Sequence, residues 1–364
     1  MKAVGLVLAS CLATLATTGT SARSQTPDFD PQARVTEALE KVRPIAYHTS
    51  RLDWVAIEAR ARALAETATD EVDLLPAYQA IVWYLEDNHS FLWPSDALKT
   101  GWQTRYGERR LLPDSPRRRV AESPFNTRTL PTASLRVLSS GRSVAMVVVP
   151  AVLNIPGEIR APYGDALYSA VAEVEPAACG FIVDLRGNTG GDVWPMVTGL
   201  SDLVGDGYVF GYVTADGEFQ PYAVLREGAA LTDPVDPEEP IINQVTGWRN
   251  VADVTNMPSA VLIDGATGSS GEGAVLSLLG RTTTRTFGSR TYGVASANDR
   301  IELSDGMVMY ITTTMAADRN GQVYPDGIPP DEAVEPGPGS PEDPSDAVEE
   351  AAMAWLARQP ACAA

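Results

Sequence analysis

The segment 259–280 carries the residues best placed for nucleophilic chemistry. An apolar run at 260–263 predicts a buried strand, small residues follow at 264–268, and a helix pattern then begins with Ser269 and Glu272 three residues apart. A serine at that position lies beside free helix amides, which stabilise a negatively charged oxygen. The same spacing is also a capping box, in which the two side chains only satisfy helix amides. Taken alone, the segment favours the cap.

A second stretch that could take part in a reaction is the glycine-rich turn 184–192, with the sequence DLRGNTGGD. It follows a predicted buried strand at 179–185 and precedes a predicted helix at 193–203. Its glycines allow the backbone to turn sharply and to approach another group closely. By itself the pattern predicts a tight strand-to-helix connection. A phosphate loop is excluded because the Gly-Lys-Ser/Thr ending is absent.

A serine nucleophile needs a partner that accepts its proton. Lysines occur only at positions 2, 41 and 99, so none follows Ser269. Arginine remains protonated and cannot act as a base. The chain has two histidines, His48 and His89, and a lone histidine is more often structural than catalytic. His89 nevertheless lies where a predicted helix ends, and it is the best remaining base.

The ring of His89 must also be oriented. Its neighbours Asp87, Asn88 and Ser90 could orient a ring nitrogen, and Ser90 is one specific candidate. Asp326, in the turn-rich stretch GQVYPDGIPP, is the other. A histidine-based site should gain activity as pH rises through the histidine pKa, which is about 6.5 when unperturbed.

Alternating strands and helices from residue 135 onward predict an α/β core that positions these residues, and helical periodicity predicts a separate helical layer before it. The interval between them is rich in arginine and looks irregular. A stretch rich in Pro, Asp and Glu predicts a surface loop or lid that borders the cleft. The predicted units are a helical subdomain at 23–97, an Arg-rich connecting segment at 98–133, a core at 134–335 with the inserted acidic loop at 216–250, and a linker with a final helix at 336–364.

The N-terminus predicts export. Lys2, an apolar run at 3–16 and small residues up to Ala22 are typical of a secretory signal peptide at 1–22, and a lipoprotein site at Cys11 ranks second. No other apolar run is long enough to span a bilayer. Whether Cys179 and Cys362 pair stays open.

Composition narrows the range of partners. The 364 residues carry a formal net charge of −19, which makes nucleic acid a poor partner. The absence of a CxxC motif or a His/Cys cluster predicts no zinc site, and no cofactor is expected. The oligomeric state is left open.

Five stretches in this order resemble the tail-specific, or C-terminal processing, serine peptidase family, over roughly residues 34–335. The alignment of TGSSGE with the family's T-x-S-x-x-E stretch puts the nucleophile on Ser269 rather than Ser270. The five stretches are LEDNHSFL at 85–92, GFIVDLRGNTGGD at 180–192, TGSSGE at 267–272, RTYG at 290–293 and GIPPD at 327–331.

The resemblance implies a core related to the crotonase and Clp peptidase fold. It implies a secreted or periplasmic serine endopeptidase that acts on peptides or unfolded protein tails. It also implies an oxyanion hole made by the backbone of Gly190 or Gly191 together with the amide of Ser270. Such donors are each worth roughly 3 kcal/mol of transition-state stabilisation.

Two departures from the family pattern bear on function. The segment 98–133 is too short for the PDZ domain of many members, and Val294 occupies the position of their lysine base. The tricorn-like branch is similar in pairing a histidine from the helical layer with the core serine. Retinoid-binding relatives show that the fold can also bind without cutting, so a non-catalytic binding protein is the alternative. An α/β-hydrolase esterase ranks low because neither Ser269 nor Ser270 lies in G-x-S-x-G.

Overall fold

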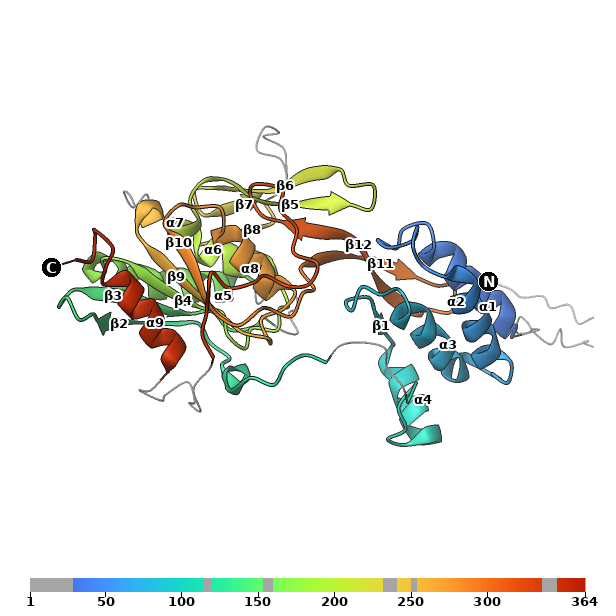
Figure 1. The fold of residues 1–364 in the computed structure, drawn as a ribbon. Coiled ribbons are helices and arrows are strands. Elements are labelled where there is room, and N and C mark those ends of the chain that lie inside the picture. The colour runs from blue at the N-terminus through green and yellow to red at the C-terminus, as the bar shows by residue number, and fades with distance from the viewer. Residues whose placement is uncertain are drawn as a thin grey trace, which may run out of the picture.

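The structure is a computed structural model, which describes residues 29–113, 119–152, 160–231, 241–249, 254–335 and 346–363. The predicted signal peptide, Cys11, the acidic run at 233–240 and the predicted linker at 336–340 lie outside the described residues. Figure 1 shows a large α/β lobe and a smaller helical lobe joined by long strands. No helix among the described residues is both long and apolar enough to cross a membrane.

The helical lobe contains α1 (Pro31–Val42), α2 (Trp54–Ala65) and α3 (Glu71–Trp83). Each helix begins after an aspartate, Asp30, Asp53 or Asp70, whose carboxylate accepts hydrogen bonds from the first helix amides. Their apolar faces share one buried cluster with Met309 and Ile311, which belong to a strand of the α/β lobe. This shared core couples the two lobes.

The start of the Arg-rich connecting segment is regular, contrary to the expectation of an irregular stretch from residue 98. Helix α4 spans Asp96–Tyr106, and the side chain of Ser95 caps it by accepting from the amide of Leu98 at 3.3 Å. None of its residues is buried. A helix without a buried face has no apolar periodicity, so its pattern cannot be read from the sequence.

The central sheet of the α/β lobe has six strands. Its order is β13 (Glu332–Ala333), β10 (Thr284–Gly288), β9 (Ser259–Ile263), β4 (Phe181–Asp184), β3 (Ser143–Val148) and β2 (Thr132–Val137). All pairs are parallel except β2 with β3. Every residue of β4 and β9 is buried, which agrees with their continuous apolar sequence.

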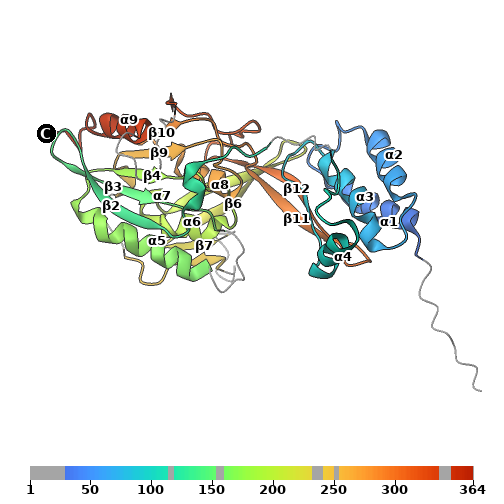
Figure 2. The same cartoon turned by 90° about the horizontal axis from the view of Figure 1, so that it is seen from below.

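Helices cover both faces of this sheet. One face packs on α5 (Arg160–Val174), α6 (Val193–Gly199) and α8 (Ser270–Leu278), and the other packs on α9 (Ala347–Leu356). Figure 2 shows α5 and α9 on opposite sides of the strands. The remaining short helices are η1 (Pro124–Thr127), η3 (Glu175–Ala177), α7 (Ser201–Val204) and η4 (Val254–Asn256). The predicted α/β class and crotonase-like core agree with this layered arrangement.

The second sheet has seven strands and is antiparallel. Strands β11 and β12 extend from the α/β lobe to the helices, as Figures 1 and 2 show. The order is β1 (Phe91–Trp93), β12 (Val308–Ala317), β5 (Gly207–Thr214), β6 (Phe219–Arg226), β7 (Ala229–Leu231) and β8 (Asn243–Gln244), with β11 (Ser296–Glu302) also paired to β12.

The expectation of an irregular acidic loop at 216–250 is wrong for most of its described part, because β6, β7 and β8 lie there. The turn between β6 and β7 explains the error. Glu227 and Gly228 adopt positive φ angles of 52° and 73°, a tight-turn geometry that lets the two strands pair directly. The acidic composition concealed this hairpin.

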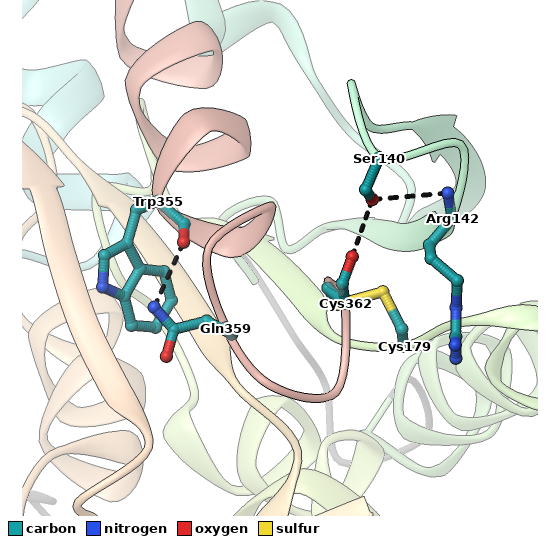
Figure 3. Close-up of a disulfide and its surroundings, with 6 residues drawn as sticks. All are labelled: Ser140, Arg142, Cys179, Trp355, Gln359 and Cys362. Carbon is teal, nitrogen blue, oxygen red and sulfur yellow. Dashed lines mark hydrogen bonds between the residues drawn. A yellow bond between two sulfur atoms is a disulfide. The ribbon is translucent and has the colours of Figure 1, made fainter. Parts of the chain in front are cut away.

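A disulfide joins Cys179, just before β4, to Cys362, in the tail after α9 (Figure 3). The two Cα atoms are 5.2 Å apart and both side chains are buried. The hydroxyl of Ser140 donates to the carbonyl of Cys362 at 2.6 Å. The tail is therefore fastened to the start of the interior strand β4, which settles the pairing that the sequence left open.

Candidate active site

Ser269 lies at the junction between β9 and α8. Its backbone has φ 53° and ψ −123°, a conformation that non-glycine residues rarely adopt and that the surroundings must hold in place. Its hydroxyl oxygen lies 3.0 Å from Nε2 of His89, which is 180 residues away in the chain. The serine side chain therefore faces the histidine that the sequence singled out.

The carboxylate of Glu272 holds in place the turn at 264–269 that carries Ser269, called the serine turn below. It is fully buried and accepts from the amide of Ser269 at 3.0 Å, so the glutamate half of the predicted capping box is present. It also accepts from the hydroxyl of Thr291 at 2.5 Å and from the amides of Gly293 and Val294, both at 2.8 Å. Burial raises the pKa of Glu272, and the four donated hydrogen bonds oppose that rise. Val294, at the family's lysine position, serves through its backbone.

The turn that carries His89 connects α3 to β1. The carboxylate of Asp87 accepts from the amides of His89 and Ser90, both at 2.8 Å. The hydroxyl of Ser90 donates to Asp87 at 2.5 Å and accepts from the amide of Thr312 at 2.9 Å. The side chain of Asn298 donates to the carbonyl of His89 at 3.3 Å. These contacts fix the turn against β11 and β12.

The second ring nitrogen of His89 has a partner that sequence reasoning missed. Nδ1 lies 2.6 Å from the hydroxyl of Ser296, the first residue of β11. Of the two predicted orienting residues, Ser90 bonds through its hydroxyl to Asp87 and Thr312, and Asp326 is exposed on the loop before β13. The only sequence signal for Ser296 is its place at the start of a strand, three residues after the end of the T-x-G turn, which is residues 291–293 of the RTYG stretch.

The glycine turn packs directly against the serine turn. Gly190 has φ 108°, and a Cβ on it would lie 2.7 Å from the Cβ of Ser269, so only glycine fits. Its amide donates to the side chain of Asn188 at 3.0 Å. The amides of Gly191 and Ser270 donate to no acceptor among the described residues, and the Ser270 hydroxyl donates to the carbonyl of Gly191 at 2.8 Å. Two unused amides therefore lie beside the nucleophile candidate.

A small pocket of about 30 Å³ opens beside Ser269. Its lining is mostly apolar. A Cβ on Gly273 would lie 2.9 Å from the side chain of Val193, so the wall of the pocket is tightly packed there. The space therefore suits a small side chain. It is lined by Val193, Phe210, Tyr212, Ser269, Ser270, Gly273, Ala295, Ser296 and Ala316. Within the described ranges, no group of three or more His, Cys, Asp or Glu side chains is gathered so that it could hold a metal ion.

Comparisons with known proteins agree with this fold. A curated relative, the nisin-resistance protein of Lactococcus lactis subsp. lactis, is 29% identical over 299 residues, which cover 81% of this chain and 80% of the relative. Among solved structures, a lipoprotein from Streptococcus agalactiae has a TM-score of 0.61 at 19% identity and covers 90% of this chain and 96% of its own. The photosystem II D1 C-terminal processing protease has a TM-score of 0.52 at 14% identity, covering 84% and 93%.

The structural neighbours share the fold, and the sequence identifies the family. The profile of Peptidase family S41 matches residues 144–334, which is more than half of the chain and includes the glycine turn, the serine turn and the T-x-G turn. The chain therefore belongs to peptidase family S41 and is a serine-type peptidase.

Proposed function

We propose that this protein is an exported serine endopeptidase that hydrolyses peptide bonds in peptides or unfolded protein tails. Ser269 is the nucleophile and His89 is the general base. The observation that carries the proposal is the 3.0 Å distance between the Ser269 hydroxyl and Nε2 of His89. A nucleophile and a base within hydrogen-bond reach, with a third group on the other ring nitrogen, are the common arrangement of covalent hydrolases.

The proton path follows from this geometry. Nε2 of His89 takes the hydroxyl proton as Oγ of Ser269 attacks the carbonyl carbon of the substrate, and it then gives that proton to the leaving amine. Nδ1 must keep its own proton throughout, so it donates to the hydroxyl oxygen of Ser296. Water then hydrolyses the acyl-enzyme, with His89 again accepting a proton. The serine is thereby regenerated.

The charge that develops on the substrate oxygen needs donors beside the serine. The amides of Gly191 and Ser270 are the donors that we assign, because the amide of Gly190 is already directed at Asn188. Each such donor contributes roughly 3 kcal/mol to transition-state stabilisation. Gly190 contributes instead by its lack of a side chain, which allows the two turns to approach.

Ser296 differs from the carboxylate found in many serine peptidase triads. A hydroxyl can fix the ring orientation and the tautomer of His89, but it carries no charge that would stabilise an imidazolium ion. Ser296 is therefore a positioning residue in this proposal. Asp326 and Ser90 have no assigned role in orienting the ring.

Export is supported by three independent features. The residues 1–22 have the order of a signal peptide, the Cys179–Cys362 disulfide is typical of oxidising compartments, and one structural neighbour is a lipoprotein. A lipid-modified Cys11 remains the alternative form of export. Mass spectrometry of the mature N-terminus separates the two.

A fluorophosphonate probe tests the proposed nucleophile. The mature protein should be labelled, and Ser269→Ala should abolish labelling, whereas Ser169→Ala, which changes an exposed serine on α5, should not. Cleavage of a peptide library by the same samples should follow the labelling. Absence of both in the wild-type protein would support the alternative, a binding protein on the same fold.

A further inference from the structure

A cluster of aromatic side chains lies on the strand that follows His89. In the ribbon formed by β1, β12 and β11, Met309 and Ile311 pack into the core of the helical lobe. Side chains alternate between the two faces of a strand, so Tyr310 points to the opposite face. Phe91 pairs with Tyr310 across the strands, and Trp93 lies two residues further on the same face. This face is directed away from the packed helices α1, α2 and α3.

The three rings form one surface. The rings of Phe91 and Tyr310 are stacked, with centroids 4.9 Å apart and planes 17° from parallel. Trp93 stands edge-on to Tyr310 at 6.3 Å, and 52% of it is exposed. The ammonium group of Lys99 lies 5.5 Å from the Trp93 ring. Phe91 and Tyr310 are half-buried, and together with the exposed Trp93 they have the composition of a recognition surface rather than of ordinary protein surface.

The charges around the rings are balanced. On β11, Arg300 and Glu302 form an ion pair at 2.8 Å, and Lys99 pairs with Asp96 at 3.1 Å. These charged groups beside the rings therefore occur in pairs of opposite sign, although the whole chain is strongly acidic. Such a surface favours an uncharged apolar or aromatic side chain over a charged one.

The position of the rings relative to the candidate catalytic residues limits what can bind there. Trp93 is four residues after His89, and even a fully extended chain advances only about 3.3 Å per residue, so the Cα atoms of the two residues lie no more than about 13 Å apart. An extended substrate held at Ser269 would reach this distance with about four of its residues. The rings and the reacting bond can therefore engage one peptide at the same time.

We propose that Phe91, Trp93 and Tyr310 form a subsite for an apolar or aromatic side chain of the peptide substrate, about four residues from the bond that is cleaved. This inference rests on the proposed function, because it identifies the chemistry of that site's substrate. The subsite contributes binding energy at a distance from the reacting atoms. Its effect therefore falls on long peptides and not on small reagents that reach only Ser269.

Matched peptides test the subsite. Each peptide keeps one cleavable core flanked by Gly and Ser, and a single Phe is placed three, four or five residues from the scissile bond on either side, with Ala as the reference. The best Phe peptide should show kcat/KM roughly tenfold above its Ala counterpart, mainly through KM. Trp93→Ala should remove this preference, so that the Phe and Ala peptides are cleaved with equal kcat/KM.

A matched variant controls for the loss of an exposed ring. Tyr208 is 37% exposed on β5 of the same sheet, and Tyr208→Ala should retain the tenfold preference. Trp93→Gln provides a second, polar replacement, and melting temperatures verify that each variant is folded. If Trp93→Ala keeps the preference, or if no placement of Phe changes kcat/KM in the wild-type enzyme, the subsite does not exist.

A binding measurement separates this proposal from the proposed catalysis. Full-length Ser269→Ala should bind the best Phe peptide roughly tenfold more tightly than the Ala peptide in calorimetry, and adding Trp93→Ala should equalise the two. This holds even if the wild-type chain neither cleaves peptides nor reacts with the probe. Equal affinities for both peptides would overturn the subsite whatever the enzyme's activity.

Discussion

The two halves of the candidate site are supported in different ways. Ser269 lies between β9 of the central sheet and α8, and the fully buried carboxylate of Glu272 ties its turn to the amides of Gly293 and Val294. His89 lies in a partly buried turn between α3 and β1, and Asp87 holds that turn through local hydrogen bonds.

This difference has consequences for mutation. The serine half shares its contacts with the core, so damage there should lower stability and activity together. The histidine half depends on a turn whose position is set by the pairing of β1 with β12 and by the packing of the helices on that ribbon. Damage to this turn should reduce activity with little loss of stability. The following predictions test this contrast, ordered by their expected effect on turnover.

The largest effect should come from the histidine itself. His89→Ala removes the proposed base and should reduce kcat by about 10³-fold or more, with a melting temperature close to that of the wild type. His48→Ala is the control, because His48 lies in the turns between α1 and α2 of the helical lobe, where its ring stands edge-on to Tyr47. Peptide cleavage and thermal melts of both variants are the measurement. Similar, mild losses of activity in His89→Ala and His48→Ala would show that His89 is not the base and that Ser269 is only a helix cap.

In the serine half, Glu272→Gln should affect activity and stability together. The new amide group would face the amides of Ser269 and Val294 if it replaced Oε2, leaving donors against donors in a buried site. We expect a loss of about 3 kcal/mol in the free energy of unfolding and a fall in kcat of roughly 100-fold.

The matched change in the histidine half is Asp87→Asn. It retains one acceptor oxygen, so turnover should fall by roughly tenfold, with less than about 1 kcal/mol lost in unfolding free energy. Denaturant titrations and steady-state kinetics of both variants measure the contrast. If Glu272→Gln left stability intact, the proposed coupling of the serine turn to the core would be incorrect.

Ser296→Ala should have a moderate effect. It removes the partner of Nδ1 of His89 and should lower kcat roughly tenfold without changing labelling specificity, because the base remains present but less well oriented. Ser296→Asp adds a negative charge that favours the imidazolium ion, so it should raise the histidine pKa and move the acid limb of the pH–rate profile to higher pH. A profile that does not move in Ser296→Asp would show that Ser296 does not contact the ring during turnover.

The smallest effect on turnover should come from the disulfide. It closes a loop of 183 residues, and its two cysteines lie 90 and 93 positions from Ser269 in the chain, so the double change of Cys179 and Cys362 to Ala should cost about 3–5 kcal/mol of stability. Turnover at a temperature well below melting should stay within about twofold of the wild-type value. Thermal melts with and without reductant, paired with kinetics, measure both quantities. A large fall in turnover would connect the C-terminal tail to the site.

Local sequence patterns were sufficient to predict much of the fold and the part of the site around Ser269. The buried strands β4 and β9 could be predicted from the sequence because a strand covered on both faces is apolar throughout. The turns that contain Gly190 and Ser269 could be predicted because a tight turn between a strand and a helix requires glycine and other small residues. The β6–β7 hairpin was missed because the segment 216–250 around it is rich in Pro, Asp and Glu, and α4 was missed because it has no buried apolar face.

The sequence by itself also determined which residue types were available for chemistry: a serine before a helix, no lysine after it and only two histidines. This excluded the family's usual base and left His89. It did not determine what His89 touches, because a motif lists neighbours in the chain and not in space. Ser296, which lies 207 positions from His89, belongs to no motif, and the candidates predicted from the sequence were Asp326 and Ser90.

Only the tertiary structure decided that Ser269, His89 and Ser296 meet. Their meeting requires the pairing of β1 and β11 with β12 and the packing of the helices against that ribbon, all of which are long-range contacts. Strand pairing depends on side chains from distant parts of the chain that fill a shared core, and no local preference encodes it. The serine and its turn are therefore local features of the sequence, whereas the complete constellation is a property of the folded chain.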